Sequence, residues 1–143
     1  MKILYSGQQI YDLIPQRPPM VMIDTVWESD DKEICTSLTI AQDNIFASGC
    51  HLEEAGLIEH IAQTAAALAG YETAVHGLPP ELGYIGEVKN FECYDLPSVG
   101  DTVHTRMEVV AKMADVTLVQ AETSLNGKPT AVCQMKIFIQ KNT

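Results

Sequence analysis

The sequence predicts an α+β protein in which an antiparallel sheet wraps around one long central helix. Residues 53–71 contain no proline and are apolar around most of the helical circumference, which is typical of a buried helix. Shorter segments rich in β-branched and apolar residues lie on both sides of it, most of them joined by short polar connections, as in antiparallel sheets. A lone helix of this kind needs a curved sheet around it to bury its surface.

The other elements are predicted in chain order. Ser6 can cap a short helix over residues 7–13, which the following prolines end. Strands are predicted over residues 20–27 and 34–40, and the polar residues between them favour a hairpin. After the long helix, Gly77 and two prolines indicate a loop. Four more strands are predicted over residues 84–94, 102–112, 116–125 and 130–140.

Length and charge restrict the class of protein. The 143 residues suit one domain, so we expect a single domain over residues 1–143. The chain has 9 Lys+Arg against 19 Asp+Glu, a net charge of −10, which argues against binding to nucleic acid or to an anionic membrane surface. No apolar run reaches the roughly 20 residues that span a bilayer, and the first residues do not resemble a signal peptide. We therefore expect a cytoplasmic protein.

The cysteines are widely spaced, with no Cys-x-x-Cys pair. Buried, reduced thiols are a better explanation than disulfides or a zinc site. A metal site made of Cys50, His51 and His60 would match no common ligand spacing, so no metal is expected.

Three stretches carry a resemblance to a known family: residues 14–26 (IPQRPPMVMIDTV), residues 56–64 (GLIEHIAQT), and residues 86–91 (GEVKNF) with 97–103 (PSVGDTV). They are similar, in this order, to the LPHRxPFLLVDRV, GVLIIEAMAQ and strand-PGDxL stretches of the hotdog-fold 3-hydroxyacyl-[acyl-carrier-protein] dehydratases. The sequence most closely resembles a divergent dehydratase-like branch, which is associated with aryl polyene and related lipid pathways.

The resemblance implies a hotdog fold and the dehydration of 3-hydroxyacyl thioesters in fatty acid, lipid or polyene biosynthesis. In this family a His and an acidic residue share the proton transfers across a dimer interface, and a helix N-terminus polarises the thioester carbonyl. The substrate is carried on the phosphopantetheine of an acyl-carrier protein, and no other cofactor is implied. The expected partners are acyl-carrier protein and a second hotdog chain, in a homodimer, a higher homo-oligomer or a hetero-oligomer.

By this resemblance, Glu59 is the candidate catalytic acid. It lies in an apolar helix, where an ionised carboxylate is costly unless it is paired, and we favour this role over an exposed position. Gln63 shares its face one turn later and either orients Glu59, contacts the acyl group, or makes a simple interior contact. Gly56 matches the position whose backbone N–H binds the thioester oxygen. Small residues at 65–67, 69 and 70 fit an acyl tunnel or close helix–sheet packing equally well.

His51 is the candidate base. Gly49-Cys50-His51 resembles the family's Gly-His stretch, but His51 precedes Glu59 by only 8 residues and the prolines of the family loop are missing. An ungapped alignment instead places the family His near Ile45. His51 is therefore either a base on a shortened loop or an incidental loop residue, and we lean slightly to the second. His60 points about 100° around the helix from Glu59 and is interpreted as a packing or interface residue.

Three functions follow as hypotheses. The leading one is a 3-hydroxyacyl-acyl-carrier-protein dehydratase or dehydratase-like protein. The alternatives are a catalytically silent hotdog subunit, which binds acyl-carrier protein or an active dehydratase partner, and an acyl thioesterase. Because acyl-carrier protein is acidic, each carrier-protein hypothesis requires a local basic patch. Arg17, Lys89 and Arg106 are candidate members, although ordinary solvated charges explain each of them individually.

Overall fold

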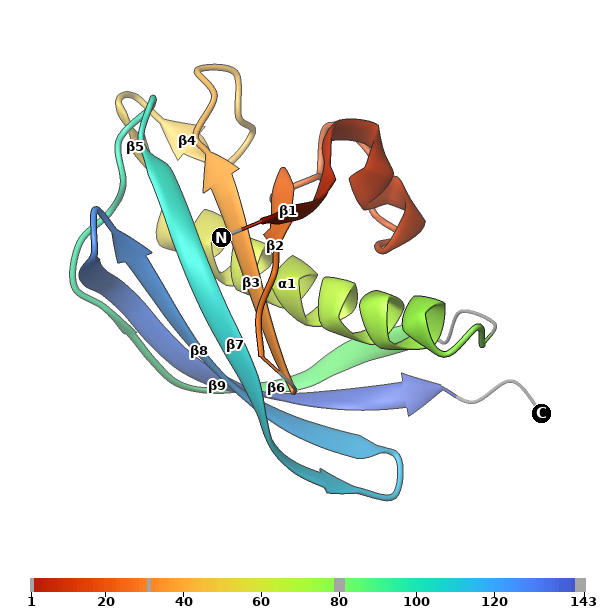
Figure 1. Ribbon diagram of the computed structural model, residues 1–143. Coiled ribbons are helices and arrows are strands. Elements are labelled where there is room, and N and C mark those ends of the chain that lie inside the picture. The colour runs from red at the N-terminus through yellow and green to blue at the C-terminus, as the bar shows by residue number, and fades with distance from the viewer. Residues whose placement is uncertain (1, 31, 79–81, 141–143) are drawn as a thin grey trace.

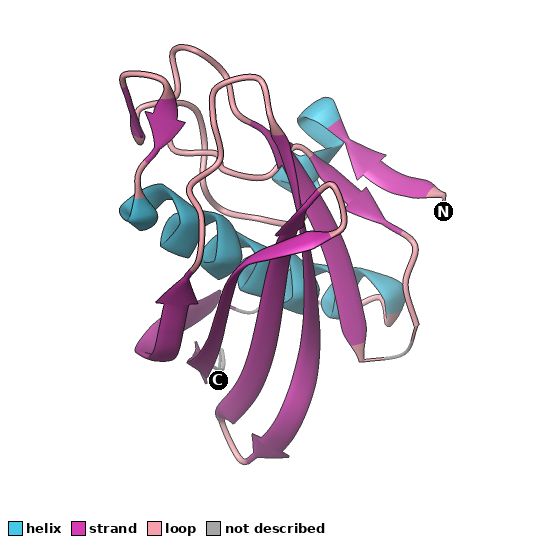
Figure 2. Ribbon diagram, turned by 90° about the vertical axis from the view of Figure 1, so that its left-hand side faces the viewer, coloured by secondary structure: helices cyan, strands magenta, loops and turns pink. Residues whose placement is uncertain are grey.

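The computed structural model describes residues 2–30, 32–78 and 82–140. A seven-stranded antiparallel sheet curves around the long helix α1 (Glu54–Val75), which lies across one face of the sheet (Figures 1 and 2). The other elements are β1 (Ile3–Ser6), the 3₁₀ helix η1 (Gly7–Asp12), β2 (Thr25–Trp27), β3 (Glu33–Thr39), β4 (Ala47–Ser48), β5 (His51–Leu52), β6 (Leu82–Cys93), β7 (Thr102–Met113), β8 (Val116–Leu125) and β9 (Lys128–Gln140).

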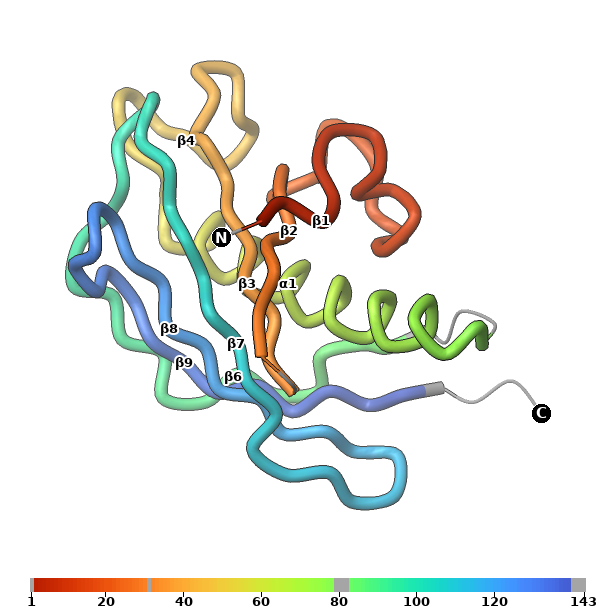
Figure 3. The backbone as a smooth tube through the Cα atoms, viewed as in Figure 1, coloured from red at the N-terminus to blue at the C-terminus, as the bar shows by residue number. Residues whose placement is uncertain are grey.

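The strand order in the large sheet is β1-β2-β3-β7-β8-β9-β6. Strand β6 follows α1 in sequence and lies at one edge of the sheet, and among the described strands it pairs with β9 alone. Strands β4 and β5 form a separate small hairpin. The chain passes from β3 through this hairpin into α1 (Figure 3). This is the hotdog arrangement that the sequence predicts, with one helix enclosed by an antiparallel sheet.

The core lies between α1 and the sheet. Ile61, Ala65 and Leu68 of the helix pack in one cluster with Met107, Val119 and Met135 of the strands. Burial of apolar side chains contributes about 25 cal/mol per Å². The helix therefore gains most of its stability from the sheet that covers it, rather than from its own propensity.

The strand predicted over residues 20–27 is mostly wrong, because only Thr25–Trp27 pairs as β2. The Met20 carbonyl and both backbone groups of Met22 bond to side chains of α1 instead of to a neighbouring strand. The short strands β1, β4 and β5 are not predicted from the sequence. The other predicted strands and the long helix are confirmed, with shifts at their ends.

Two further expectations need correction. The helix expected over residues 7–13 is a 3₁₀ helix that ends at Asp12, with the Ser6 N–H bonded to Gln9 Oε1 at 3.1 Å. All four cysteines are free thiols, as expected, but only Cys133 is buried and Cys50 is exposed. Burial raises the pKa of the Cys133 thiol to about 11, which keeps it protonated and unreactive at neutral pH.

Candidate active site

Glu59 lies in the second turn of α1 and is half-buried. Its neighbours on the outer side of the helix are apolar, namely Ile58, Ala62 and Ala66, and all three are partly exposed. Its Oε1 accepts a hydrogen bond of 2.8 Å from Gln63 Nε2, one turn later. The carboxylate is thus held at the border between the core and an open apolar helix face.

Gln63 is fully buried, and every hydrogen-bonding group of its amide is in use. Its Oε1 accepts from the Met22 N–H at 2.5 Å. Its Nε2 donates to the Met20 carbonyl at 2.6 Å and to Glu59. Because a backbone N–H only donates and a backbone carbonyl only accepts, these contacts fix which way the amide points. The sequence leaves open whether Gln63 orients Glu59, contacts the acyl group or makes a simple interior contact. The structure shows that it contacts Glu59.

His60 is fully buried, and both ring nitrogens are bonded. Nδ1 lies 2.7 Å from the Met22 carbonyl oxygen and Nε2 lies 2.8 Å from Thr105 Oγ1. Burial lowers the pKa of His60 to about 4, although the Met22 hydrogen bond and the Asp24 carboxylate oppose this shift. The ring is therefore neutral at pH 7, with Nδ1–H donating to Met22 and Nε2 accepting from the Thr105 hydroxyl.

The hydroxyl of Thr105 has a second hydrogen-bond partner, on the neighbouring strand β8. Because Thr105 donates its only hydroxyl proton to His60, it must accept from Thr123 Oγ1, which lies 2.7 Å away. A second buried pair, Thr36 and Thr64, joins at 2.8 Å, and Thr64 also donates to the His60 backbone carbonyl. From the sequence, His60 is interpreted only as a packing or interface residue, because its hydrogen-bond partners are distant in sequence.

His51 lies on β5, is exposed, and pairs with Ser48 across the β4–β5 hairpin. A backbone bridge to Ser98 and the Leu52 N–H bond to the Pro97 carbonyl (2.9 Å) hold the hairpin against the chain before β7. Among the interactions described within this chain, none joins the His51 ring to Glu59. The role of His51 as a base therefore stays a prediction.

Gly56 is buried in the first turn of α1. Its N–H donates to the Glu53 carbonyl at 2.9 Å. A Cβ at this position would stand 2.7 Å from both Leu52 Cδ1 and Phe46 Cβ, so a side chain would displace the β4–β5 hairpin. Close packing thus explains the glycine itself, and contact between its N–H and a thioester oxygen remains a prediction.

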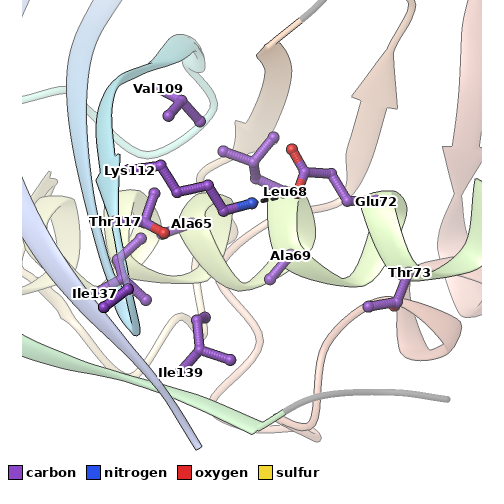
Figure 4. A pocket seen from close by; sticks show the side chains of 11 residues that line it. Ala65, Leu68, Ala69, Glu72, Thr73, Val109, Lys112, Thr117, Ile137 and Ile139 are labelled. Atoms are coloured by element: carbon purple, nitrogen blue, oxygen red, sulfur yellow. Dashed lines mark ion pairs between the residues drawn. The ribbon is translucent and has the colours of Figure 1, made fainter. Parts of the chain in front are cut away.

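A cavity of about 240 Å³ lies between the C-terminal half of α1 and strands β7, β8 and β9 (Figure 4). Ala65, Leu68 and Ala69 form its helix wall, and Lys112 and Glu72 face each other across it at 3.7 Å. Gly70, in contrast, packs against the Leu13 carbonyl. Some small residues of the helix therefore line the cavity, and others allow close packing. Glu59 does not line this cavity.

The three basic side chains that are candidates for a basic patch each have hydrogen-bond or ion-pair partners within the chain. Arg17 donates to the carbonyls of Tyr11, Ile14 and Gln16. Lys89 lies 3.9 Å from Glu87, and Arg106 lies 3.2 Å from Glu33. They do not form a shared basic surface in the described contacts.

Within residues 2–30, 32–78 and 82–140, no three His, Cys, Asp or Glu side chains are arranged to hold a metal ion. In the same part of the chain, no helix is long and apolar enough to cross a membrane.

The fold and its similarity to known proteins define a hotdog protein of the dehydratase and thioesterase kind. Residues 8–143 match the ApeP-like family, described as ApeP dehydratase, and the chain belongs to this family. The predicted resemblance to dehydratases of the hotdog fold is thereby confirmed.

Individual relatives agree with this family. An uncharacterised thioester dehydrase of Halalkalibacterium halodurans is 24% identical over 137 residues, which cover 91% of this chain and 86% of the relative. The dehydratase heterocomplex ApeI:P of Xenorhabdus doucetiae contains a chain that superposes with a TM-score of 0.85 at 18% identity, over 94% of this chain and 91% of that one. A hypothetical thioesterase of Streptococcus pneumoniae, solved with coenzyme A, superposes with a TM-score of 0.67 at 8% identity, over 82% and 85%.

Proposed function

We propose that this chain is a 3-hydroxyacyl thioester dehydratase subunit that acts on acyl chains carried by acyl-carrier protein. The observation that carries the proposal is Glu59, a carboxylate on a largely apolar helix that is held by Gln63 and opens onto a partly exposed apolar face. Membership in the ApeP-like dehydratase family supports the reaction type. The phosphopantetheine of the carrier protein is the only prosthetic group required, and a cytoplasmic location suits that partner.

The chemistry consists of one proton removed and one supplied. A base takes a proton from C2 of the substrate, and the C3–O bond breaks as the C2=C3 double bond forms. An acid donates a proton to the departing hydroxyl, which leaves as water. Glu59 is the acid in this scheme and His51 is the base, each needing to approach its proton to about 3 Å. The backbone at Gly56, near the start of α1, would bind the thioester oxygen.

A second hotdog chain completes this site in our proposal. Strand β6 is an edge strand of 12 residues, and long unpaired edges favour pairing with another chain. Tyr84 and Val88 are exposed on it, 58% and 39% respectively. The partly exposed face of α1 around Ile58 and Ala62 offers further apolar surface beside Glu59. A homodimer and a hetero-oligomer can both cover these surfaces.

The second candidate function is a catalytically silent subunit that supports an active hotdog partner or binds acyl-carrier protein. Two observations favour it. His51 is exposed on a short hairpin and is not joined to Glu59 in the described contacts. The similar structure of Xenorhabdus doucetiae is a heterocomplex. In that case the partner chain supplies both the acid and the base.

The test is the Glu59→Gln variant, assayed for hydration of a crotonyl thioester by the purified chain and by its complex with any co-purifying hotdog chain. We expect hydration to fall by about 10²–10⁴-fold, the usual contribution of a general acid. Glu108→Gln, which removes an exposed carboxylate on β7, is the matched control and should keep wild-type turnover. Unchanged turnover in Glu59→Gln would remove Glu59 from the mechanism.

The products separate the remaining alternatives. Mass spectrometry of a 3-hydroxyacyl substrate gives an enoyl thioester for a dehydratase and a free acid for a thioesterase. A silent subunit gives neither product alone, but increases the activity of a partner with which it co-elutes. His51→Ala then locates the base, because it abolishes activity only where this chain supplies that group.

A further inference from the structure

Glu59 is connected to the centre of the sheet through a continuous set of buried contacts. Gln63 holds the carboxylate directly, but its own amide is fixed by the backbone of Met20 and Met22. That segment belongs to no strand, so no ladder of backbone hydrogen bonds holds Met22 in place. Its N–H and its carbonyl are instead both bonded to side chains of α1, by Gln63 and His60 respectively.

His60 can hold the Met22 carbonyl only in one tautomer. A carbonyl oxygen only accepts, so Nδ1 must carry the proton, and a neutral ring then needs a donor at Nε2. Thr105 on β7 supplies that donor at 2.8 Å, and Thr123 on β8 fixes the Thr105 hydroxyl from the other side at 2.7 Å. Two central strands of the sheet therefore determine the state of the His60 ring.

We propose that His60, oriented by Thr105, is a positioning residue for Glu59: it anchors Met22, Met22 and Met20 fix the amide of Gln63, and Gln63 holds the carboxylate. His60 is not a catalytic residue in this arrangement, since it is fully buried and both of its ring nitrogens are bonded within the protein. The inference rests on the proposed role of Glu59. A purely structural role would instead give His60 an effect on stability alone.

A pair of amide substitutions separates the two contacts of the ring. In His60→Asn, the side-chain amide can take the place of Nδ1–H and keep the bond to Met22. In His60→Gln, the longer side chain places its amide near Nε2, which keeps the contact with Thr105 but loses Met22. We expect kcat of the crotonyl-thioester hydration to fall by about 10–100-fold in His60→Gln with KM nearly unchanged, because a misplacement of about 1 Å can cost 10²-fold. His60→Asn should recover most of this loss.

Thr36→Val is the control for the effect of losing any buried hydrogen bond in the core. It breaks the buried hydrogen bond between Thr36 and Thr64 on the same helix, and none of the described hydrogen bonds of the Thr36 side chain involves Met22 or Gln63. We expect it to lower stability without changing kcat. If His60→Gln does not fold, Thr105→Val serves instead, because it removes the hydroxyl that donates to Nε2, together with the bond of that hydroxyl to Thr123. We expect it to lower kcat in the same direction with a smaller effect.

A second readout does not depend on activity. The side-chain amide protons of Gln63 should exchange slowly with solvent in the wild type and in His60→Asn, as measured by NMR, and rapidly in His60→Gln. If Glu59→Gln keeps full turnover, the proposed function fails, while slow exchange in the wild type and fast exchange in His60→Gln still report the anchoring. If turnover requires Glu59 but His60→Gln leaves both kcat and Gln63 exchange unchanged, the inference about His60 is overturned.

Discussion

His60 and Gln63 belong to a helix whose other buried side chains are nearly all apolar, yet each of their polar side-chain groups has a partner. Burying such groups unpaired costs roughly 1–3 kcal/mol each. Apart from Glu59, which is four residues from Gln63, their partners lie 38 to 45 residues away along the chain. These residues therefore specify where the segment before β2 meets the helix, which hydrophobic packing alone would leave less well defined.

The buried, neutral His60 ring makes the stability of the protein depend on pH. Its pKa falls from 6.5 to about 4 on folding, so between these values the unfolded chain binds a proton that the folded chain does not. The contribution of the neutral ring to the free energy of unfolding amounts to about 3 kcal/mol. It is complete above pH 6.5 and is lost as the pH falls toward 4. We expect the free energy of unfolding, measured in urea at pH 7 and pH 4, to fall more in the wild type than in His60→Asn by this amount. Equal losses in the two proteins would contradict this.

At this scale the sequence predicts some contacts and not others. The four-residue spacing of Glu59 and Gln63 places them on one face of the helix, and their hydrogen bond confirms this. The role of His60 could not be predicted in the same way. Its spacing from Glu59 shows only that it points elsewhere, and nothing local indicates that Met22 and Thr105 are its partners. Contacts between distant segments require the fold itself.

Among the elements, α1 is the one whose packing determines the site. Its length and its apolar circumference could be predicted because both are local properties of the sequence. The strand content of residues 20–27 could not, since Met20 and Met22 have strand-like neighbours but bond to helix side chains. The short β4–β5 hairpin was also missed, because two-residue strands carry too few residues for a periodic signal.

Gly70 tests how closely α1 approaches the chain after η1. By helix propensity alone, Gly70→Ala should stabilise the protein by about 1 kcal/mol. A Cβ here, however, would meet the backbone carbonyl of Leu13, and backbone atoms cannot rotate away. Overpacking of this kind costs about 1–3 kcal/mol, so we expect a net loss of about 1 kcal/mol in denaturant unfolding.

The exposed end of the same helix provides the comparison for Gly70. Ala74→Gly at this exposed position in the last turn should cost at most about 1 kcal/mol through propensity alone. If Gly70→Ala proves more stable than the wild type, while Ala74→Gly loses the expected amount, then the helix does not lie against Leu13 as described.

For the molecule as a whole, the net charge of −10 bears directly on what it can bind. Lys89 and Lys136 both pair with Glu87, and Arg106 pairs with Glu33. An acidic carrier protein would therefore meet a surface of its own sign. The proposed assembly resolves this difficulty if a second, basic hotdog chain supplies the positive surface at which the carrier protein docks.

The salt dependence of association separates the two possible assemblies. Two copies of this chain repel each other, so a homodimer should become tighter as added salt screens the repulsion. A complex with a basic hotdog chain should weaken under the same conditions, by about tenfold or more between 50 mM and 500 mM salt, because electrostatic attraction raises association rates by about 10–10³-fold. Analytical ultracentrifugation of the chain alone and of the mixture measures both. A mixed complex that tightens with salt would exclude a basic partner, and the carrier protein would then have to dock through the few cations of this chain itself.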